Sequence, residues 1–104
     1  MIARKPDALI LNEHTAAHVA ELFRAFSDTS RVRILSVLVS GKMNVSALAK
    51  TVGISESAVS HHMRGLRQMR LVTSRKEGKE VYYVVEDEHI IHLFQQGVQH
   101  VQDE

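Results

Sequence analysis

The chain has 104 residues, 44% hydrophobic and 24% charged, which is enough for one compact globular domain and excludes two. It contains no cysteine, so disulfides, thiolate zinc fingers, iron–sulfur clusters and a cysteine nucleophile are excluded, and any metal site must use His, Asp or Glu. The net charge of +1 is unevenly spread: residues 61–80 hold six Arg or Lys and two Glu, whereas residues 86–104 hold five acidic residues and no Arg or Lys. No apolar run is long enough for a secretory signal or a membrane span, so we expect a cytoplasmic protein with no membrane partner.

The sequence predicts an N-terminal arm over residues 1–11, followed by a single domain over residues 12–104. A first helix is expected over residues 12–26, where apolar residues recur at spacings of three and four. The polar cluster at residues 27–30 ends this helix and caps a second one, which ends before Gly41.

Two further helices follow and form the pattern of a helix-turn-helix. The third is short and ends at Gly53, and the fourth begins after Ser55, a natural N-cap, and runs to about residue 69. At about 100° per residue, one side of the fourth helix is apolar. The opposite side carries Ser57, Ser60, His61, Arg64 and Gln68. Short polar side chains beside an arginine suit contacts with base edges and phosphates, and the alternative is a merely solvated helix face.

A β-hairpin is predicted directly after the fourth helix. Residues 71–75 and 81–85 are rich in β-branched and aromatic side chains, and residues 76–80, which include one glycine, join them. A hairpin in this place is a wing, and its cations are expected to contact DNA phosphates. These cations are Arg75, Lys76 and Lys79. Because Glu77 and Glu80 lie among them, a plain surface hairpin is the alternative.

The last helix is expected to begin at Asp87 and to run to the C-terminus. Its apolar residues cover a wide arc, so we expect it to pack both on its own core and on a second copy of the chain. The expected fold class is therefore mainly α with a β-hairpin wing: a winged helix-turn-helix that forms a homodimer.

The last helix also carries a spaced set of metal-ligating residues. His89 and His100 are eleven residues apart, which keeps them within about 20° of one face but separates them by about 16 Å along the axis. If two such helices pack antiparallel, Asp87 and His89 of one chain meet His100 and Asp103 of the other, which gives two equivalent sites. This ligand set suits Zn²⁺ and also Co²⁺, whereas Ni²⁺ normally takes more ligands. The alternative is a capping Asp, two polar-face histidines and a frayed acidic end.

The remaining histidines have simpler interpretations. His92, one turn from His89, is expected to be solvated, and His62 is expected to pack beside the buried side of its helix. His14 and His18 stand at positions i and i+4 and could clamp a metal, but no thiolate accompanies them and we do not expect a site there.

The sequence resembles the ArsR/SmtB metal-sensing repressors over roughly residues 15–104. The matching segments are residues 23–28 (FRAFSD), 31–35 (RVRIL), 52–63 (VGISESAVSHHM), 71–72 (LV), 78 (G) and 81–83 (VYY). The resemblance implies a dimeric winged helix-turn-helix protein that represses an efflux or sequestration operon and leaves its double-stranded operator DNA when metal binds.

The resemblance also bears on the metal. Where many members have a thiolate-bearing motif, this chain has Asn44 and Ala47, so the arsenic, cadmium and lead type of site is absent. The zinc-sensing branch instead has an Asp-x-His pattern followed eleven residues later by His-x-x-Glu or His-x-x-His, which Asp87, His89 and His100 fit. The last ligand is then Asp103, which has a shorter reach than Glu, and Glu104 is a substitute for it.

Three functions can be weighed from these residues. The leading one is a repressor that responds to Zn²⁺, with Co²⁺ or Ni²⁺ as other candidate ions. The second is a dimeric DNA-binding regulator that responds to Co²⁺ or Ni²⁺, or to no metal, its last helix then serving only dimerisation. A zinc hydrolase is disfavoured, because four protein ligands leave no open position for water and no His-Glu-x-x-His motif is present. We therefore expect no enzymatic activity and no small-molecule substrate.

Overall fold

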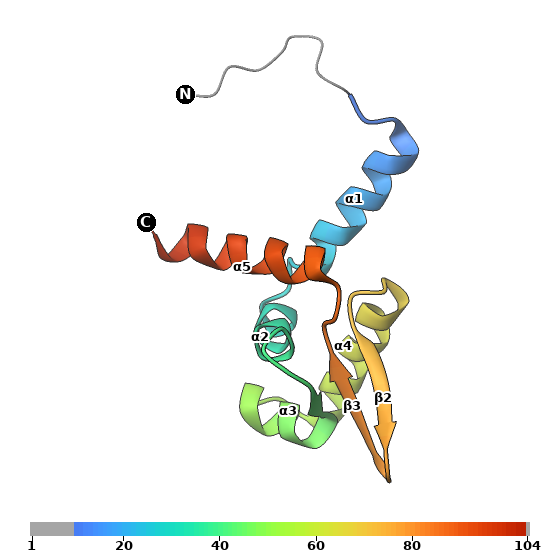
Figure 1. Cartoon of the computed structure of the whole chain (residues 1–104), viewed down its shortest axis with the longest axis vertical. Coiled ribbons are helices and arrows are strands. Elements are labelled where there is room, and N and C mark those ends of the chain that lie inside the picture. Colours follow the sequence, from blue (N-terminus) through green and yellow to red (C-terminus); the bar gives the residue numbers. More distant parts are fainter. Residues whose placement is uncertain (1–9, 104) are drawn as a thin grey trace.

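The computed structural model describes residues 10–103 of the chain, and these form a mainly α fold with a β-hairpin wing, as predicted (Figure 1). In chain order the elements are α1 (Glu13–Ala25), α2 (Thr29–Leu38), β1 (Met43–Asn44), α3 (Val45–Val52), α4 (Glu56–Gln68), β2 (Thr73–Glu77), β3 (Glu80–Val84) and α5 (Glu88–Gln102). Most of the predicted N-terminal arm, and also Glu104, lies outside the described residues.

Each helix begins at a side chain that caps it. Asn12, Asp28, Asn44 and Ser55 each accept a hydrogen bond from the backbone N–H three residues later, and Asp87 accepts one from two residues later, over 2.8 to 3.1 Å. These bonds satisfy donors that the first turn of a helix leaves without partners. The predicted helix starts at Ser55 and Asp87 are thereby confirmed.

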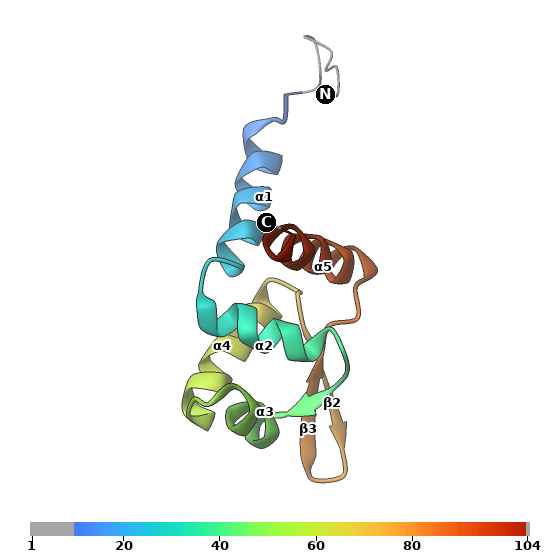
Figure 2. The ribbon, with the colours of Figure 1, turned by 90° about the vertical axis from the view of Figure 1, so that its left-hand side faces the viewer.

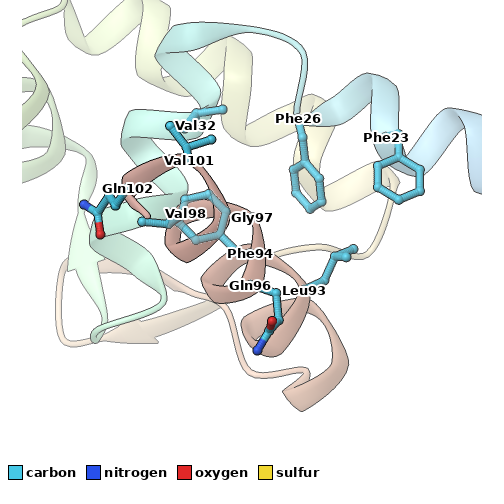
Figure 3. Close-up of a pocket in the computed structure, with 10 residues that line it drawn as sticks. All are labelled: Phe23, Phe26, Val32, Leu93, Phe94, Gln96, Gly97, Val98, Val101 and Gln102. Atoms are coloured by element: carbon cyan, nitrogen blue, oxygen red, sulfur yellow. The ribbon is translucent and has the colours of Figure 1, made fainter. Parts of the chain in front are cut away.

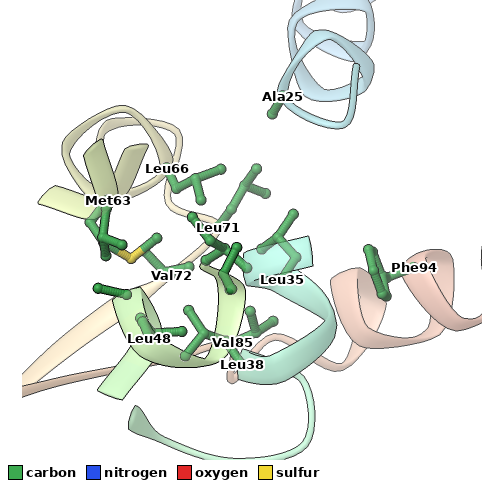
Figure 4. Close-up of a cluster of buried hydrophobic side chains, with 14 residues drawn as sticks. Ala25, Leu35, Leu38, Leu48, Met63, Leu66, Leu71, Val72, Val85 and Phe94 are labelled. Carbon is green, nitrogen blue, oxygen red and sulfur yellow. The ribbon is translucent and has the colours of Figure 1, made fainter. Parts of the chain in front are cut away.

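The buried core is formed mainly by α2, α3, α4 and the base of the wing (Figure 4). Its fully buried large side chains are Ile34, Leu35, Leu38, Leu48, Val59, Met63 and Leu66. The wing is attached through the backbone, because the Val85 N–H donates to the Leu38 carbonyl over 3.3 Å. By contrast, α1 buries only Ala25 and α5 only Phe94, so both helices lie at the edge of this body (Figure 2).

The wing belongs to a three-stranded antiparallel sheet with the order β1-β3-β2. The bounds of the predicted hairpin are wrong, because β2 begins at Thr73 instead of residue 71 and β3 at Glu80 instead of residue 81. The strands continue to a pair between Glu77 and Glu80, so the turn has only two residues, and Gly78 supplies the positive φ of 64° that such a turn requires. Strand β1 was not predicted, because two residues are too few for a hydrophobic alternation to show.

Within residues 10–103, none of the helices has both the length and the apolar character needed to cross a bilayer.

Candidate nucleic-acid interface and metal-ligating helix

The two sides of α4 divide as the sequence predicts. Val59, Met63 and Leu66 are fully buried against the core. The opposite side is exposed and carries the five residues of this helix that were predicted to contact DNA, namely Ser57, Ser60, His61, Arg64 and Gln68. Gln68, at the end of the helix, also lines a polar pocket together with His18 and Glu21 of α1. The exposed side of α4 is therefore polar along its whole length, and its last turn lies beside α1.

A hydrogen bond between side chains fixes the position of α4 against α2. The Arg31 Nε donates to His62 Nδ1 over 3.2 Å, and this bond requires an unprotonated Nδ1. Arg31 passes so close to Gly65 that a Cβ there would lie 3.2 Å from Nη2 of the arginine. Burial lowers the pKa of His62, which favours the neutral ring that the bond needs. His62 is half-buried as predicted, but its arginine partner was not foreseen.

The three cations predicted on the wing have different surroundings. Lys76 and Lys79 are exposed near the tip, whereas Arg75 Nη2 lies 2.6 Å from Glu86 Oε2 at the base of the hairpin. The Thr73 hydroxyl donates to the same carboxylate over 2.7 Å, and this bond, followed by the charge of Arg75, holds the pKa of Glu86 below its usual value. The structure therefore leaves two lysines, rather than three cations, at the tip.

The carboxylates of the wing are contacted by two residues outside it, which the sequence pattern did not connect with the wing. The Lys42 Nζ forms a hydrogen-bonded ion pair with Glu77 and lies 5.0 Å from the centre of the Tyr82 ring. The Asn44 Nδ2 donates to Glu80 Oε2 over 3.3 Å. The partners are 35 and 36 residues apart in the chain, so no local pattern reveals these contacts.

The residues predicted to bind metal lie at the two ends of α5. At its N-terminus, Asp87 Oδ1 accepts from the His89 backbone N–H over 2.8 Å and lies 3.2 Å from His89 Nδ1. The backbone bond is the main reason why the pKa of Asp87 is lowered. At the other end, His100 and Asp103 are both exposed. Among the described residues, no three His, Asp or Glu side chains come together as a metal ion would need, and the predicted ligands stay apart at the two ends of α5.

The other exposed histidines pair within their own helices. His92 lies 3.6 Å from Glu88 in the first turn of α5 and is exposed, as predicted. The rings of His14 and His18 are 4.4 Å apart on the solvent-exposed start of α1.

An apolar groove of about 670 Å³ separates α5 from α1 and α2 (Figure 3). Its lining residues are Phe23, Phe26, Val32, Leu93, Phe94, Gln96, Gly97, Val98, Val101 and Gln102. Phe26 packs edge-on against Phe94, with ring centres 6.3 Å apart, and so forms the inner wall. Towards the solvent, Phe23 is 52% and Val101 64% exposed. The last helix therefore packs Phe94 against the core and leaves Val101 uncovered, beside a groove whose other exposed side chain, Phe23, comes from α1.

Comparison of the sequence with known proteins identifies its relatives. A family model described as "Bacterial regulatory protein, arsR family" matches residues 28–74, which run from the cap of α2 into the wing. A transcriptional repressor SmtB homolog from Synechocystis sp. is 39% identical over 99 residues, which make up 95% of this chain and 74% of the relative.

Solved structures share the fold over nearly the whole chain, as two of them illustrate. The AntR antimony-specific transcriptional repressor superposes with a TM-score of 0.84 and 25% identity, covering 99% of this chain and 96% of that one. A homodimeric winged helix-turn-helix DNA-binding domain from Mycobacterium bovis superposes with a TM-score of 0.77 and 32% identity, covering 90% of this chain and 89% of its own. The likeness therefore includes α1 and α5 as well as the central body.

Proposed function

Since this chain belongs to the arsR family of bacterial regulatory proteins, we propose that it is a metal-responsive transcriptional repressor that binds double-stranded operator DNA as a homodimer. The observation that carries the proposal is the exposed polar side of α4, next to a wing with two exposed lysines. The Synechocystis relative is a transcriptional repressor by name, and the structural neighbour AntR is an antimony-specific one. Such a protein acts where the DNA is, so the proposal includes a cytoplasmic location.

In the proposed complex α4 lies in the major groove. Its exposed residues before the last turn include Arg64, whose guanidinium can bond a guanine edge, and Ser60 and His61, which can reach base edges or phosphates. Lys76 and Lys79 contact the neighbouring phosphate backbone from the tip of the wing. The Arg31–His62 bond supports this surface from behind, because it fixes α4 against α2.

The proposed dimer forms across the groove between α1 and α5. A twofold interface uses the same patch on both protomers, and the exposed Phe23 and Val101 give each copy apolar surface to bury. The Mycobacterium bovis domain, which this chain resembles over 90% of its length, is homodimeric. The two copies of α4 then face successive half-sites on one side of the DNA.

The proposed effector is Zn²⁺, as in the zinc-sensing branch that the sequence resembles. Asp87 and His89 of one protomer would bind it together with the partner subunit's His100 and Asp103, with Glu104 as a substitute for the last ligand. Two imidazoles and two carboxylates without a thiolate suit Zn²⁺ or Co²⁺, and all four side chains are exposed on the described chain. The choice of metal rests on this donor set and not on the antimony-specific neighbour.

The proposal is tested by the linkage between metal and DNA. If metal releases DNA, then bound DNA must weaken Zn²⁺ binding by the same factor, because the coupling free energy is reciprocal. Zn²⁺ affinity is therefore measured with and without a duplex from the region upstream of the protein's own gene, at fixed salt and pH, with His89→Ala as the matched control. If the protein binds the duplex but its Zn²⁺ affinity is the same with and without DNA, the second candidate is favoured, a regulator whose α5 serves only dimerisation.

A further inference from the structure

The tip of the wing carries negative charge that a DNA-binding hairpin must neutralise. The register of β2 and β3 places Glu77 directly opposite Glu80, next to Lys76 and Lys79. Two like charges in opposite positions repel each other, and both would repel phosphates. Arg75 does not compensate them, because it is paired with Glu86 at the other end of the hairpin. Taken alone, the two glutamates cancel the two lysines.

Side chains from the segment before α3 contact both glutamates. Lys42 forms an ion pair with Glu77, and Asn44 donates to Glu80 over 3.3 Å. We call this set of four residues the wing strap. With Lys42 included, the tip has a net positive charge, and neither carboxylate is left without a polar contact.

The strap occupies one face of the sheet. Asn44 pairs with Tyr82 across β1 and β3, and residues in directly opposite positions share a face, as do residues two apart along a strand. Glu80 is two residues before Tyr82 and opposite Glu77, so both carboxylates lie on the Asn44 face. Lys42 reaches the same face, since its Nζ lies 5.0 Å from the centre of the Tyr82 ring. Lys76, one residue before Glu77, lies on the other face.

Asn44 also connects the strap to the helix-turn-helix. Its Oδ1 accepts from the Ala47 backbone N–H over 2.8 Å and so caps α3, while its Nδ2 holds Glu80. One side chain therefore joins the first helix of the DNA-binding unit to the wing. The wing is held at a defined position relative to α3 and, through the packing of α3 on α4, relative to the surface proposed to read DNA.

We propose that Lys42 and Asn44 are positioning residues for DNA binding: Lys42 neutralises Glu77 and Asn44 holds Glu80 in place on the same face, so that the two carboxylates do not repel the phosphate backbone that Lys76 and Lys79 contact. This inference rests on the DNA-binding function proposed above. Lys42 acts through Glu77, and the effect of removing it therefore depends on whether residue 77 is charged.

A double-mutant cycle between Lys42 and Glu77 tests the inference. Binding to a fluorescent duplex of mixed sequence is measured over a series of salt concentrations for the parent, Lys42→Met, Glu77→Gln and the double variant. The loss of one effective cation lowers affinity about eightfold at about 0.1 M salt and reduces the salt slope by about one. We expect that loss for Lys42→Met in the parent and little or no loss in the Glu77→Gln background. An equal loss in both backgrounds would show that Lys42 contacts phosphate by itself and would overturn the inference.

Two controls separate positioning from general charge and from folding. Lys50, exposed on α3, is matched in charge, so Lys50→Met should have the same effect in both Glu77 backgrounds. The Lys42 and Glu77 side chains are about half exposed, so the thermal midpoint should change little in all variants, and Lys42→Arg should keep the parent affinity.

The contact between Asn44 and Glu80 is tested independently with a second set of variants. Asn44→Ser keeps an N-cap for α3 but is too short to reach Glu80, so it should weaken duplex binding in the parent and have little effect in the Glu80→Gln background. An equal loss in both backgrounds would overturn the role of Asn44. A parent protein that binds no duplex at any salt concentration would overturn the proposed function as well, whereas duplex binding with no coupling in either cycle would overturn the strap alone.

Discussion

Replacing Phe23 with serine should weaken the proposed dimer by about a hundredfold at only a modest cost to the folded protomer. Phe23 stands at the outer side of the apolar groove, with 52% of its surface exposed, so about half of its burial free energy is available to a partner. Full burial of a phenylalanine contributes about 3 kcal/mol, which leaves about 1.5 kcal/mol for the interface. A twofold dimer contains this residue twice, so the expected loss is about 3 kcal/mol, or about two powers of ten in the dissociation constant.

Sedimentation equilibrium over a wide range of protein concentrations measures this dissociation constant directly. The matched control is Val81→Ser, because Val81 is 40% exposed but lies on the wing, away from the groove. We expect the control to dimerise like the parent, and circular dichroism to show the same helix content in both variants. If Phe23→Ser dimerises as tightly as Val81→Ser, the groove is not the dimer interface and the argument from its uncovered apolar surface is wrong.

Further tests concern DNA binding, the metal ligands and pH. Arg64→Ala should weaken binding to a specific duplex by about 1 to 3 kcal/mol if the guanidinium reads a base, and an unchanged affinity in a mobility-shift titration would show that the DNA-reading surface is misplaced. In a mixed dimer with His89→Ala in one protomer and His100→Ala in the other, Zn²⁺ titration should find one complete site and one without either imidazole; two half-damaged sites would refute ligand sharing between protomers. Burial lowers the pKa of His62 below its ordinary 6.5, so the unfolded chain takes up the proton first. The free energy of unfolding should therefore be undiminished above about pH 6.5 and decrease as the pH falls from there through the lower folded pKa. Chemical denaturation should show a smaller decrease for His62→Asn, and an identical pH profile would contradict the assignment.

The structure explains which parts of the fold could be predicted. Capping and hydrophobic periodicity are local, and they act within three or four residues along the chain. The helix starts at Ser55 and Asp87, and the buried and exposed sides of α4, were therefore predicted correctly. The spacing of His89 and His100 likewise indicated that the two side chains lie near opposite ends of the last helix, because the rise of a helix is fixed.

Contacts between distant segments were decided only by the tertiary structure. Strand β1 exists because β3 offers it hydrogen-bonding partners, and its own two residues carry no signal. Arg31 meets His62, and Lys42 meets Glu77, across 31 and 35 residues of chain, and neither pair shows a spacing that identifies its partner. The position of Arg75 depends in the same way on Glu86. A local pattern fixes the face on which a side chain lies, but which charge it meets there depends on how the packed elements bring separate segments together.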